Sequence, residues 1–126
     1  MKLITLITIT LFTLNIYATE ASISESPYNF VKLNIGHGKP HLIELGSEKC
    51  PACKIMGRTL YKAKKENPNF NISYINISKD RSVATSFGVQ MIPTQIIFDK
   101  NGVEAYRHVG KLSRDELLEV FKKYQF

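Results

Sequence analysis

The stretch Glu48-Lys49-Cys50-Pro51-Ala52-Cys53-Lys54 decides how the rest of this chain is interpreted. It holds the only two cysteines of the 126 residues, in the spacing C-x-x-C. A disulfide between residues this close removes little entropy from the unfolded chain, so it adds little stability. Two thiols at this spacing can close into a small ring, open again, and exchange electrons with other thiols. The spacing therefore indicates redox chemistry and disfavours a structural cross-link.

A zinc site is the main alternative for such a pair, because C-x-x-C is half of many zinc sites. A closed site needs two further ligands, and the chain has no second C-x-x-C. Its three histidines, His37, His41 and His108, form no H-x3-H pair. We therefore expect no metal, and we interpret the histidines as surface or loop residues without a role.

The N-terminus has the pattern of a secretory signal. Lys2 supplies the positive charge, residues 3–16 form a mostly apolar run, and Ala18 is a small residue at the expected cleavage point. The run is short for a membrane span, which needs about 20 residues. We expect residues 1–18 to be a cleaved signal peptide, with an uncleaved anchor as the alternative. Export implies an oxidising compartment, and we expect the periplasm.

The remaining chain has the length of one domain. We expect an N-terminal segment over residues 19–39, polar and flexible as far as Ser26, and a folded domain over residues 40–126. The formal charge of +6 is spread along the chain. No Arg-rich arm or nucleic-acid recognition motif accompanies it, so we expect no nucleic-acid partner. We expect a monomer.

The hydrophobic pattern predicts alternating strands and helices. Residues 27–33 fit either a helix or a strand. Strands are expected at residues 41–45, 70–77, 94–98 and 103–109. One helix is expected from Pro51 to before Asn67, and its inward-facing residues are expected to be Ile55, Met56, Leu60 and Ala63. A second helix is expected from Asp80 to Phe87, and a third is expected to begin at the capping box Ser113–Glu116. Asn101-Gly102 predicts a hairpin turn. The order predicts an α/β fold: a central mixed sheet with a C-terminal antiparallel hairpin, flanked by helices.

Pro51 suits the first position of a helix, which places Cys50 at or near its N-cap. A thiol there faces unpaired backbone N–H groups and the positive end of the helix dipole. Both favour the thiolate, which is the nucleophile, so Cys50 is predicted to attack. Cys53 lies one turn inside the helix and is predicted to resolve the mixed disulfide.

Three segments of the sequence resemble the thioredoxin family. Residues 42–54 resemble its active-site region, residues 88–94 resemble the segment that carries its cis-proline, and residues 109–113 resemble its late glycine and the start of its final helix. The likeness covers residues 40–124 in order and spacing. It implies a thioredoxin-like fold and a redox-active disulfide that needs no cofactor.

The resemblance implies roles for individual residues. Pro93 matches the cis-proline, which would expose the backbone of Ile92 to a substrate strand. A trans proline is the alternative. Gly110 matches the glycine that lets a substrate approach, and Pro51 is also expected to bind the substrate.

Glu44 matches the buried acid of the family. A lone carboxyl in an apolar strand has a raised pKa, and it can take the proton of Cys53 during resolution. An acid that faces solvent is the alternative. The chain departs from the family at Lys49, where an aromatic residue is usual, at Pro51-Ala52, where Gly-Pro is usual, and at Tyr74, where a lysine is often found near the acid.

The resemblance also guides the expected direction of electron flow. Strongly oxidising members often place a histidine between the cysteines, whereas this chain has Pro51-Ala52. Isoleucine before the proline also resembles the reducing members. We expect an exported reductase of protein disulfides, supplied with electrons by a membrane-embedded donor. An oxidase or isomerase is the first alternative, and a non-catalytic binding module is the second.

Overall fold

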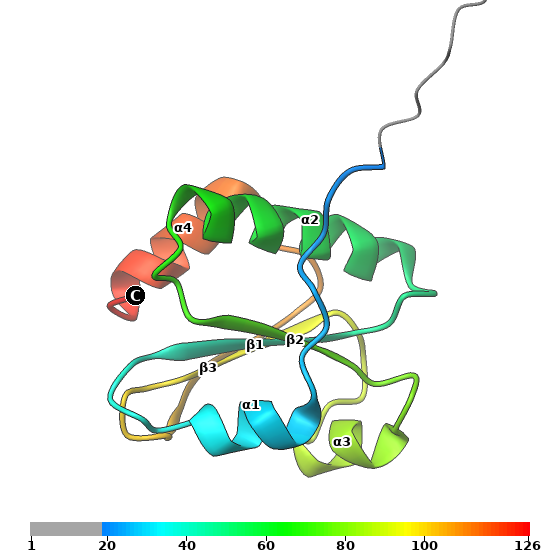
Figure 1. The fold of residues 1–126 in the computed structure, drawn as a ribbon, viewed down its shortest axis with the longest axis horizontal. Coiled ribbons are helices and arrows are strands. Elements are labelled where there is room, and N and C mark those ends of the chain that lie inside the picture. The colour runs from blue at the N-terminus through cyan, green and yellow to red at the C-terminus, as the bar shows by residue number, and fades with distance from the viewer. Residues whose placement is uncertain (1–18) are drawn as a thin grey trace, which may run out of the picture.

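The computed structural model describes residues 19–126. Its elements follow the alternating order that the sequence predicts. They are α1 (Tyr28–Asn34), β1 (His41–Gly46), α2 (Pro51–Glu66), β2 (Ile72–Asn76), α3 (Arg81–Ser86), β3 (Thr94–Phe98), β4 (Glu104–Val109) and α4 (Arg114–Lys123) (Figure 1). The segment that fits either a helix or a strand by its sequence is the helix α1.

The four strands form one mixed sheet in the order β2-β1-β3-β4. β1 pairs parallel with β2 and antiparallel with β3, and β3 pairs antiparallel with β4 through the predicted hairpin. Gly102 adopts a φ of +83° in that turn, which glycine reaches without a steric penalty. The sheet therefore has the parallel part and the antiparallel hairpin expected from the sequence.

Helices cover both faces of the sheet (Figure 1). One core lies between the sheet and the helices α2 and α4, and its largest members include Leu42, Leu60 and Phe121. The second core lies on the opposite face and includes Val31 of α1 and Val83 of α3. Successive strand residues point to opposite faces, so neighbouring residues of β1 supply both cores and all six are buried.

The predicted helix ends are confirmed. Asp80 caps α3, and its side chain accepts a hydrogen bond from the backbone of Ser82. Ser113 and Glu116 form a complete capping box at the start of α4. The expectation that Ile55 faces inward is wrong, since its side chain is 41% exposed. Met56, Leu60 and Ala63 make the buried stripe at helical spacing, and Ile55 lies about 100° to one side of it.

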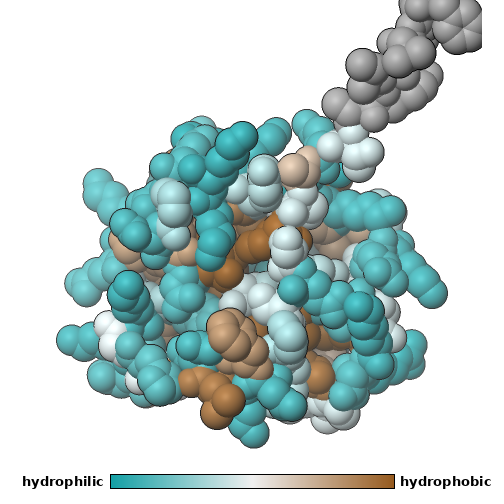
Figure 2. All heavy atoms as spheres, viewed as in Figure 1, coloured by the Kyte–Doolittle hydropathy of each residue, from teal (hydrophilic) through white to brown (hydrophobic). Residues whose placement is uncertain are grey.

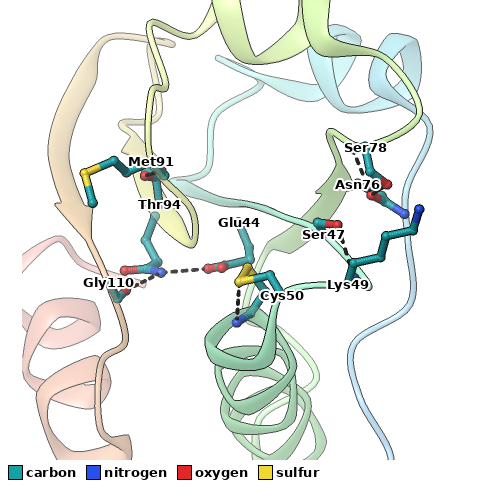
Figure 3. The surroundings of a disulfide bond; sticks show 11 residues. Glu44, Ser47, Lys49, Cys50, Asn76, Ser78, Met91, Thr94 and Gly110 are labelled. Atoms are coloured by element: carbon teal, nitrogen blue, oxygen red, sulfur yellow. Dashed lines mark hydrogen bonds between the residues drawn. A yellow bond between two sulfur atoms is a disulfide. The ribbon is translucent and has the colours of Figure 1, made fainter.

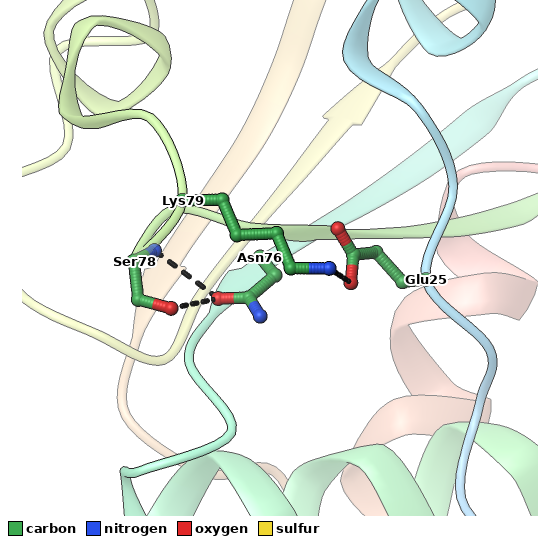
Figure 4. A network of polar contacts seen from close by, with 4 residues as sticks. All are labelled: Glu25, Asn76, Ser78 and Lys79. Carbon is green, nitrogen blue, oxygen red and sulfur yellow. Dashed lines mark hydrogen bonds and ion pairs between the residues drawn. The ribbon is translucent and has the colours of Figure 1, made fainter.

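Residues 19–26, here called the edge segment, are not the flexible stretch that their polar sequence predicts. The Ile23 backbone donates to the Gly57 carbonyl of α2 at 3.1 Å, and the Ser26 backbone donates to the Tyr74 carbonyl of β2 at 2.7 Å. Ion pairs strengthen this attachment, including one of 2.8 Å between Glu25 and Lys79 (Figure 4). The edge segment lies along α2 and the outer edge of β2, where unpaired strand groups are covered.

The surface seen in Figure 2 is mainly hydrophilic. Hydrophobic side chains are exposed on it in small patches, one of them over α1, where Phe30 is 60% exposed and Leu33 is 73% exposed. None of the helices within residues 19–126 combines the length and apolar character of a membrane span. The expected signal peptide, residues 1–18, lies outside the described residues.

Candidate active site

Cys50 occupies the N-cap of α2, as the sequence predicts. Its backbone is extended, Pro51 follows at the first helical position, and the Cys53 backbone N–H donates to Cys50 Sγ at 3.2 Å. The two cysteines form a disulfide, with their Cα atoms 5.2 Å apart. Cys50 is partly exposed, whereas Cys53 is only 6% exposed. An incoming sulfur therefore has access to Cys50 and little access to Cys53.

Gly46, the last residue of β1, makes room for Cys53. A Cβ atom on Gly46 would lie 3.2 Å from Cys53 Cβ and 3.3 Å from Cys53 Sγ. It would also lie 3.3 Å from the ring of Tyr74. The absence of a side chain at this position lets the first turn of α2 approach the end of the sheet. Sequence reasoning did not assign Gly46 a role.

Glu44 lies in the middle of β1, on the face of the sheet that packs against α2. Its side chain is 1% exposed, and it points toward the disulfide (Figure 3). Burial raises the pKa of the Glu44 carboxyl to about 8, and a hydrogen bond from Gln95 opposes that rise. The Glu44 carboxyl is therefore buried in the core, and the alternative of an acid that faces solvent is wrong.

Gln95 is the polar residue that sequence reasoning missed. It lies opposite Glu44 in the antiparallel register of β1 and β3 and is 0% exposed. Its Nε2 donates to Glu44 Oε2 at 3.0 Å and to the Gly110 carbonyl at 3.0 Å. The only sequence signal was a glutamine in an otherwise apolar strand, and its partners lie 51 and 15 residues away.

Tyr74 flanks Glu44 on the other side, because it is the partner of Glu44 in the parallel register of β1 and β2. Burial is the main cause that raises the pKa of Tyr74 to about 12, with nearby carboxylates adding to it. A neutral hydroxyl therefore stands where the resemblance to thioredoxins implies a lysine. Tyr74 and Cys53 both line a small cavity of about 210 Å³ that Ser22 and Ile23 of the edge segment partly cover.

The segment before β3 lies on the opposite side of the disulfide from this cavity. The Ile92–Pro93 peptide bond is cis, and the Gly110 backbone donates to the Pro93 carbonyl at 2.8 Å. The strand register places Leu45, Thr94 and Val109 side by side, at the end of the sheet from which the Cys50 loop leaves. Figure 3 shows Met91, Thr94 and Gly110 around the disulfide.

The predicted site residues are thus brought to one end of the sheet. Pro51 is exposed, Ile92 and Gly110 are partly exposed, and Pro93 is buried. Two exposed apolar side chains without a predicted role, Met91 at 67% and Val109 at 50%, add to this surface. Neither was predicted from the sequence, because an apolar residue in or next to a strand is usually part of the hydrophobic core.

The expectation that all histidines are surface or loop residues is wrong for His41. It starts β1 at the end of the sheet opposite the disulfide, is 1% exposed, and its Nε2 lies 2.8 Å from Ser73 Oγ. Burial is the main cause that lowers the pKa of His41 to about 4. Within residues 19–126, no three His, Cys, Asp or Glu side chains gather in a way that could hold a metal ion.

Comparison with known proteins identifies the family. A family model described as a thioredoxin-like domain matches residues 30–125. Thioredoxin from Chlamydia muridarum (strain MoPn / Nigg) is 34% identical over 84 residues, which cover 67% of this chain and 81% of that protein. The chloroplastic thioredoxin-like protein HCF164 from Arabidopsis thaliana is 30% identical over 88 residues, which cover 68% of this chain and 34% of that protein.

The fold agrees with these sequence matches. The crystal structure of chloroplastic thioredoxin z superposes with a TM-score of 0.74 at 16% identity, and the match covers 83% of this chain and 96% of that chain. The thioredoxin-like fold expected from the sequence is therefore confirmed. With a C-x-x-C disulfide at the start of α2 and a matching family model, the chain belongs to the thioredoxin family of thiol-disulfide oxidoreductases.

Proposed function

We propose that this chain is an exported protein-disulfide reductase that works through Cys50 and Cys53. One observation carries the proposal: a partly exposed cysteine caps α2, its disulfide partner is buried, and the buried Glu44 carboxyl lies in the surroundings of this disulfide (Figure 3). This arrangement separates an attacking sulfur from a protected resolving sulfur. It also supplies a proton acceptor where the second step needs one.

In the first step, the reduced protein meets a disulfide of its client. The Cys50 thiolate is stabilised by the N-terminal N–H groups of α2, one of which already points at Cys50 Sγ. It attacks one client sulfur, the client disulfide breaks, and a Cys50–client disulfide forms. The other client sulfur leaves as a thiolate and takes a proton from solvent.

In the second step, the Cys53 thiol gives its proton to the Glu44 carboxylate. The Cys53 thiolate attacks Cys50 Sγ, the mixed disulfide breaks, and the second client sulfur leaves as a thiolate. Two electrons have then passed from the dithiol to the client, and the protein holds the Cys50–Cys53 disulfide. Glu44 returns its proton to solvent before the next cycle.

The client binds across the end of the sheet in this proposal. Pro51, Ile92, Pro93 and Gly110 form the surface that meets the client chain, and the backbone at Ile92 pairs with it as with an added strand. The exposed Met91 and Val109 side chains supply apolar contact area beside the disulfide. Chain segments with apolar residues near their cysteines fit this surface best.

The sequence supports the proposed compartment and electron supply. Residues 1–18 act as the export signal, and the periplasm is the proposed destination. An oxidising compartment offers no general reductant. A membrane-embedded dithiol donor therefore returns two electrons to the Cys50–Cys53 disulfide after each cycle. The reducing direction rests on the neutral residues Pro51 and Ala52 between the cysteines, which offer no charge to stabilise a thiolate.

The test is turnover by single-cysteine variants in an insulin disulfide reduction assay. The Cys50→Ala variant should lose all activity, because the attacking sulfur is gone. The Cys53→Ala variant should lose turnover but accumulate mixed disulfides with client proteins, visible on non-reducing gels. Turnover at the wild-type rate by either variant rejects these roles, and binding of a partner that survives both changes would instead support a non-catalytic binding module.

A further inference from the structure

We propose that Gln95 is a positioning residue that links the carboxyl of Glu44 to the client-binding backbone at Gly110 and determines which oxygen of that carboxyl carries the proton. This inference rests on the proposed roles of Glu44 and Gly110. It gives this protein a direct hydrogen-bonded connection between the site of proton transfer and the surface that binds the client.

The connection consists of buried contacts. Gln95 Nε2 donates one hydrogen to Glu44 Oε2 and the other to the Gly110 carbonyl, each at 3.0 Å (the two dashed lines between Glu44 and Gly110 in Figure 3). The Gly110 backbone in turn donates to the Pro93 carbonyl at 2.8 Å. Gln95 and Glu44 are 0% and 1% exposed, so water does not compete freely for these bonds.

The orientation of the Gln95 amide follows from chemistry. The Gly110 carbonyl can only accept a hydrogen bond, so the NH2 group of Gln95 must face it. The same nitrogen then donates to Glu44 Oε2. Exchanging the amide oxygen and nitrogen would place an oxygen against the Gly110 carbonyl and cost both bonds. Glu44 Oε2 is thereby held as an acceptor.

The proton of neutral Glu44 is left on the other oxygen. Among the described residues, Glu44 Oε1 is buried and has no hydrogen-bond partner. A carboxyl whose Oε2 accepts from an amide carries its proton best on Oε1. Oε1 is therefore the atom that takes the Cys53 proton. Among the titratable groups of the neighbouring elements, Tyr74 of β2 is the register partner of Glu44, His108 of β4 is the register partner of Gln95, and Cys53 of α2 lies against Gly46 at the end of β1.

The link has a consequence for binding. A client strand that pairs with the backbone near Gly110 draws on the carbonyl that Gln95 holds. Weakening that bond leaves the Gln95 amide free to bond more strongly to the ionised carboxyl. Client binding and ionisation of Glu44 then favour one another, and this coupling is reciprocal. Proton acceptance is in this way tied to occupancy of the client surface.

The first test uses the unaltered oxidised protein. The side-chain amide signals of Gln95 should titrate in NMR spectra with the same midpoint as the Glu44 carboxyl carbon, near pH 8. In the Glu44→Gln variant this titration of the amide should vanish. Amide signals that stay fixed while the Glu44 carbon titrates would overturn the proposal, and this outcome does not depend on whether the protein reduces disulfides.

The second test removes the amide. Gln95→Met keeps the length of the side chain, and loss of a hydrogen bond that favours the carboxylate should raise the Glu44 midpoint by about one pH unit. The pH profile of mixed-disulfide resolution should move by the same amount. The matched control is Gln90→Met, an exposed glutamine, with an unchanged midpoint.

A double variant separates this inference from the proposed function. In the Glu44→Gln background, Gln95→Met should cause no further change in the pH profile. An unchanged midpoint in Gln95→Met, with only a lower melting temperature, would make Gln95 a structural residue and reject the link. If the Glu44→Gln variant resolves the mixed disulfide as fast as the wild type, the proposed role of Glu44 is rejected. The NMR midpoints of Glu44 and Gln95 then still test the link between these two residues.

Discussion

Gly46 and Cys53 are in contact across the junction of β1 and α2, and a Cβ atom on Gly46 would lie 3.2 Å from Cys53 Cβ. Neither partner moves easily, because Gly46 is in the sheet and Cys53 is in the first turn of a helix. This contact fixes the distance between the resolving sulfur and the end of the strand that carries Glu44.

A methyl group at Gly46 should therefore disturb the site. Gly46→Ala introduces contacts of 3.2–3.3 Å with Cys53 and Tyr74. We expect it to lower the free energy of unfolding by about 1–3 kcal/mol, as overpacking does elsewhere. Urea unfolding measures this directly, and a stopped-flow assay of the reduced protein measures the slowed release of the second thiolate. If Gly46→Ala and the wild type have equal stability and equal rates, the neighbouring atoms can move enough to accommodate the added methyl group.

Glu44→Gln should slow resolution of the mixed disulfide. With a pKa of about 8, the Glu44 carboxyl accepts a proton more readily as the pH rises. In the wild type, the rate of mixed-disulfide resolution should rise up to tenfold per pH unit below pH 8 and become constant above pH 8. The variant should be slower and lack this inflection. A variant with the same rate and the same profile would return Glu44 to a purely structural role.

Glu44 should also shape stability as a function of pH. Burial lets the folded protein hold this proton up to about pH 8, whereas the unfolded chain releases it near 4.5. The stabilisation is complete below pH 4.5 and is lost as the pH rises toward 8, on the order of 5 kcal/mol in total. The unfolding free energy of Glu44→Gln, relative to the wild type, should increase by that order across this window. A difference independent of pH contradicts the burial argument.

His41 should act in the opposite direction. The folded protein keeps this ring neutral down to about pH 4, whereas the unfolded chain binds a proton below 6.5. Stability is therefore lost as the pH falls from 6.5 to 4, on the order of 3 kcal/mol. His41→Asn should flatten this part of the curve in denaturant titrations, with the exposed His37→Asn as the matched control. If the His41→Asn variant loses stability between pH 6.5 and 4 as steeply as the wild type, the pH dependence comes from other groups.

Much of the fold was accessible from the sequence because local signals agree with the tertiary structure. Pro51 begins α2, Asp80 and Ser113 cap their helices, and Gly102 closes the hairpin. These features act over a few residues, so their spacing is visible in the sequence. The mixed sheet with its C-terminal antiparallel hairpin followed from the alternation of elements and the family pattern.

The missed features depend on contacts between distant residues. His41 is buried, and the Ser73 hydroxyl that lies 2.8 Å from its Nε2 comes from a residue 32 positions away. The edge segment is ordered because α2 and β2 offer it backbone groups and ion pairs, which no property of its polar sequence predicts. Gln95 acts through Glu44 and Gly110, which only the strand register brings together. Glu44 itself was found because the family pattern fixes its distance from Cys50.

In the proposed function, Cys50 and Cys53 give electrons to protein disulfides. The most direct measurement is the reduction potential of this pair, by equilibration against glutathione and quantification of free thiols. We expect a value at or below roughly −200 mV, in the range of thioredoxins and glutaredoxins, because Pro51 and Ala52 offer no charge that favours the reduced form. A value near roughly −120 mV would make the protein a disulfide donor and contradict the proposed direction of electron flow.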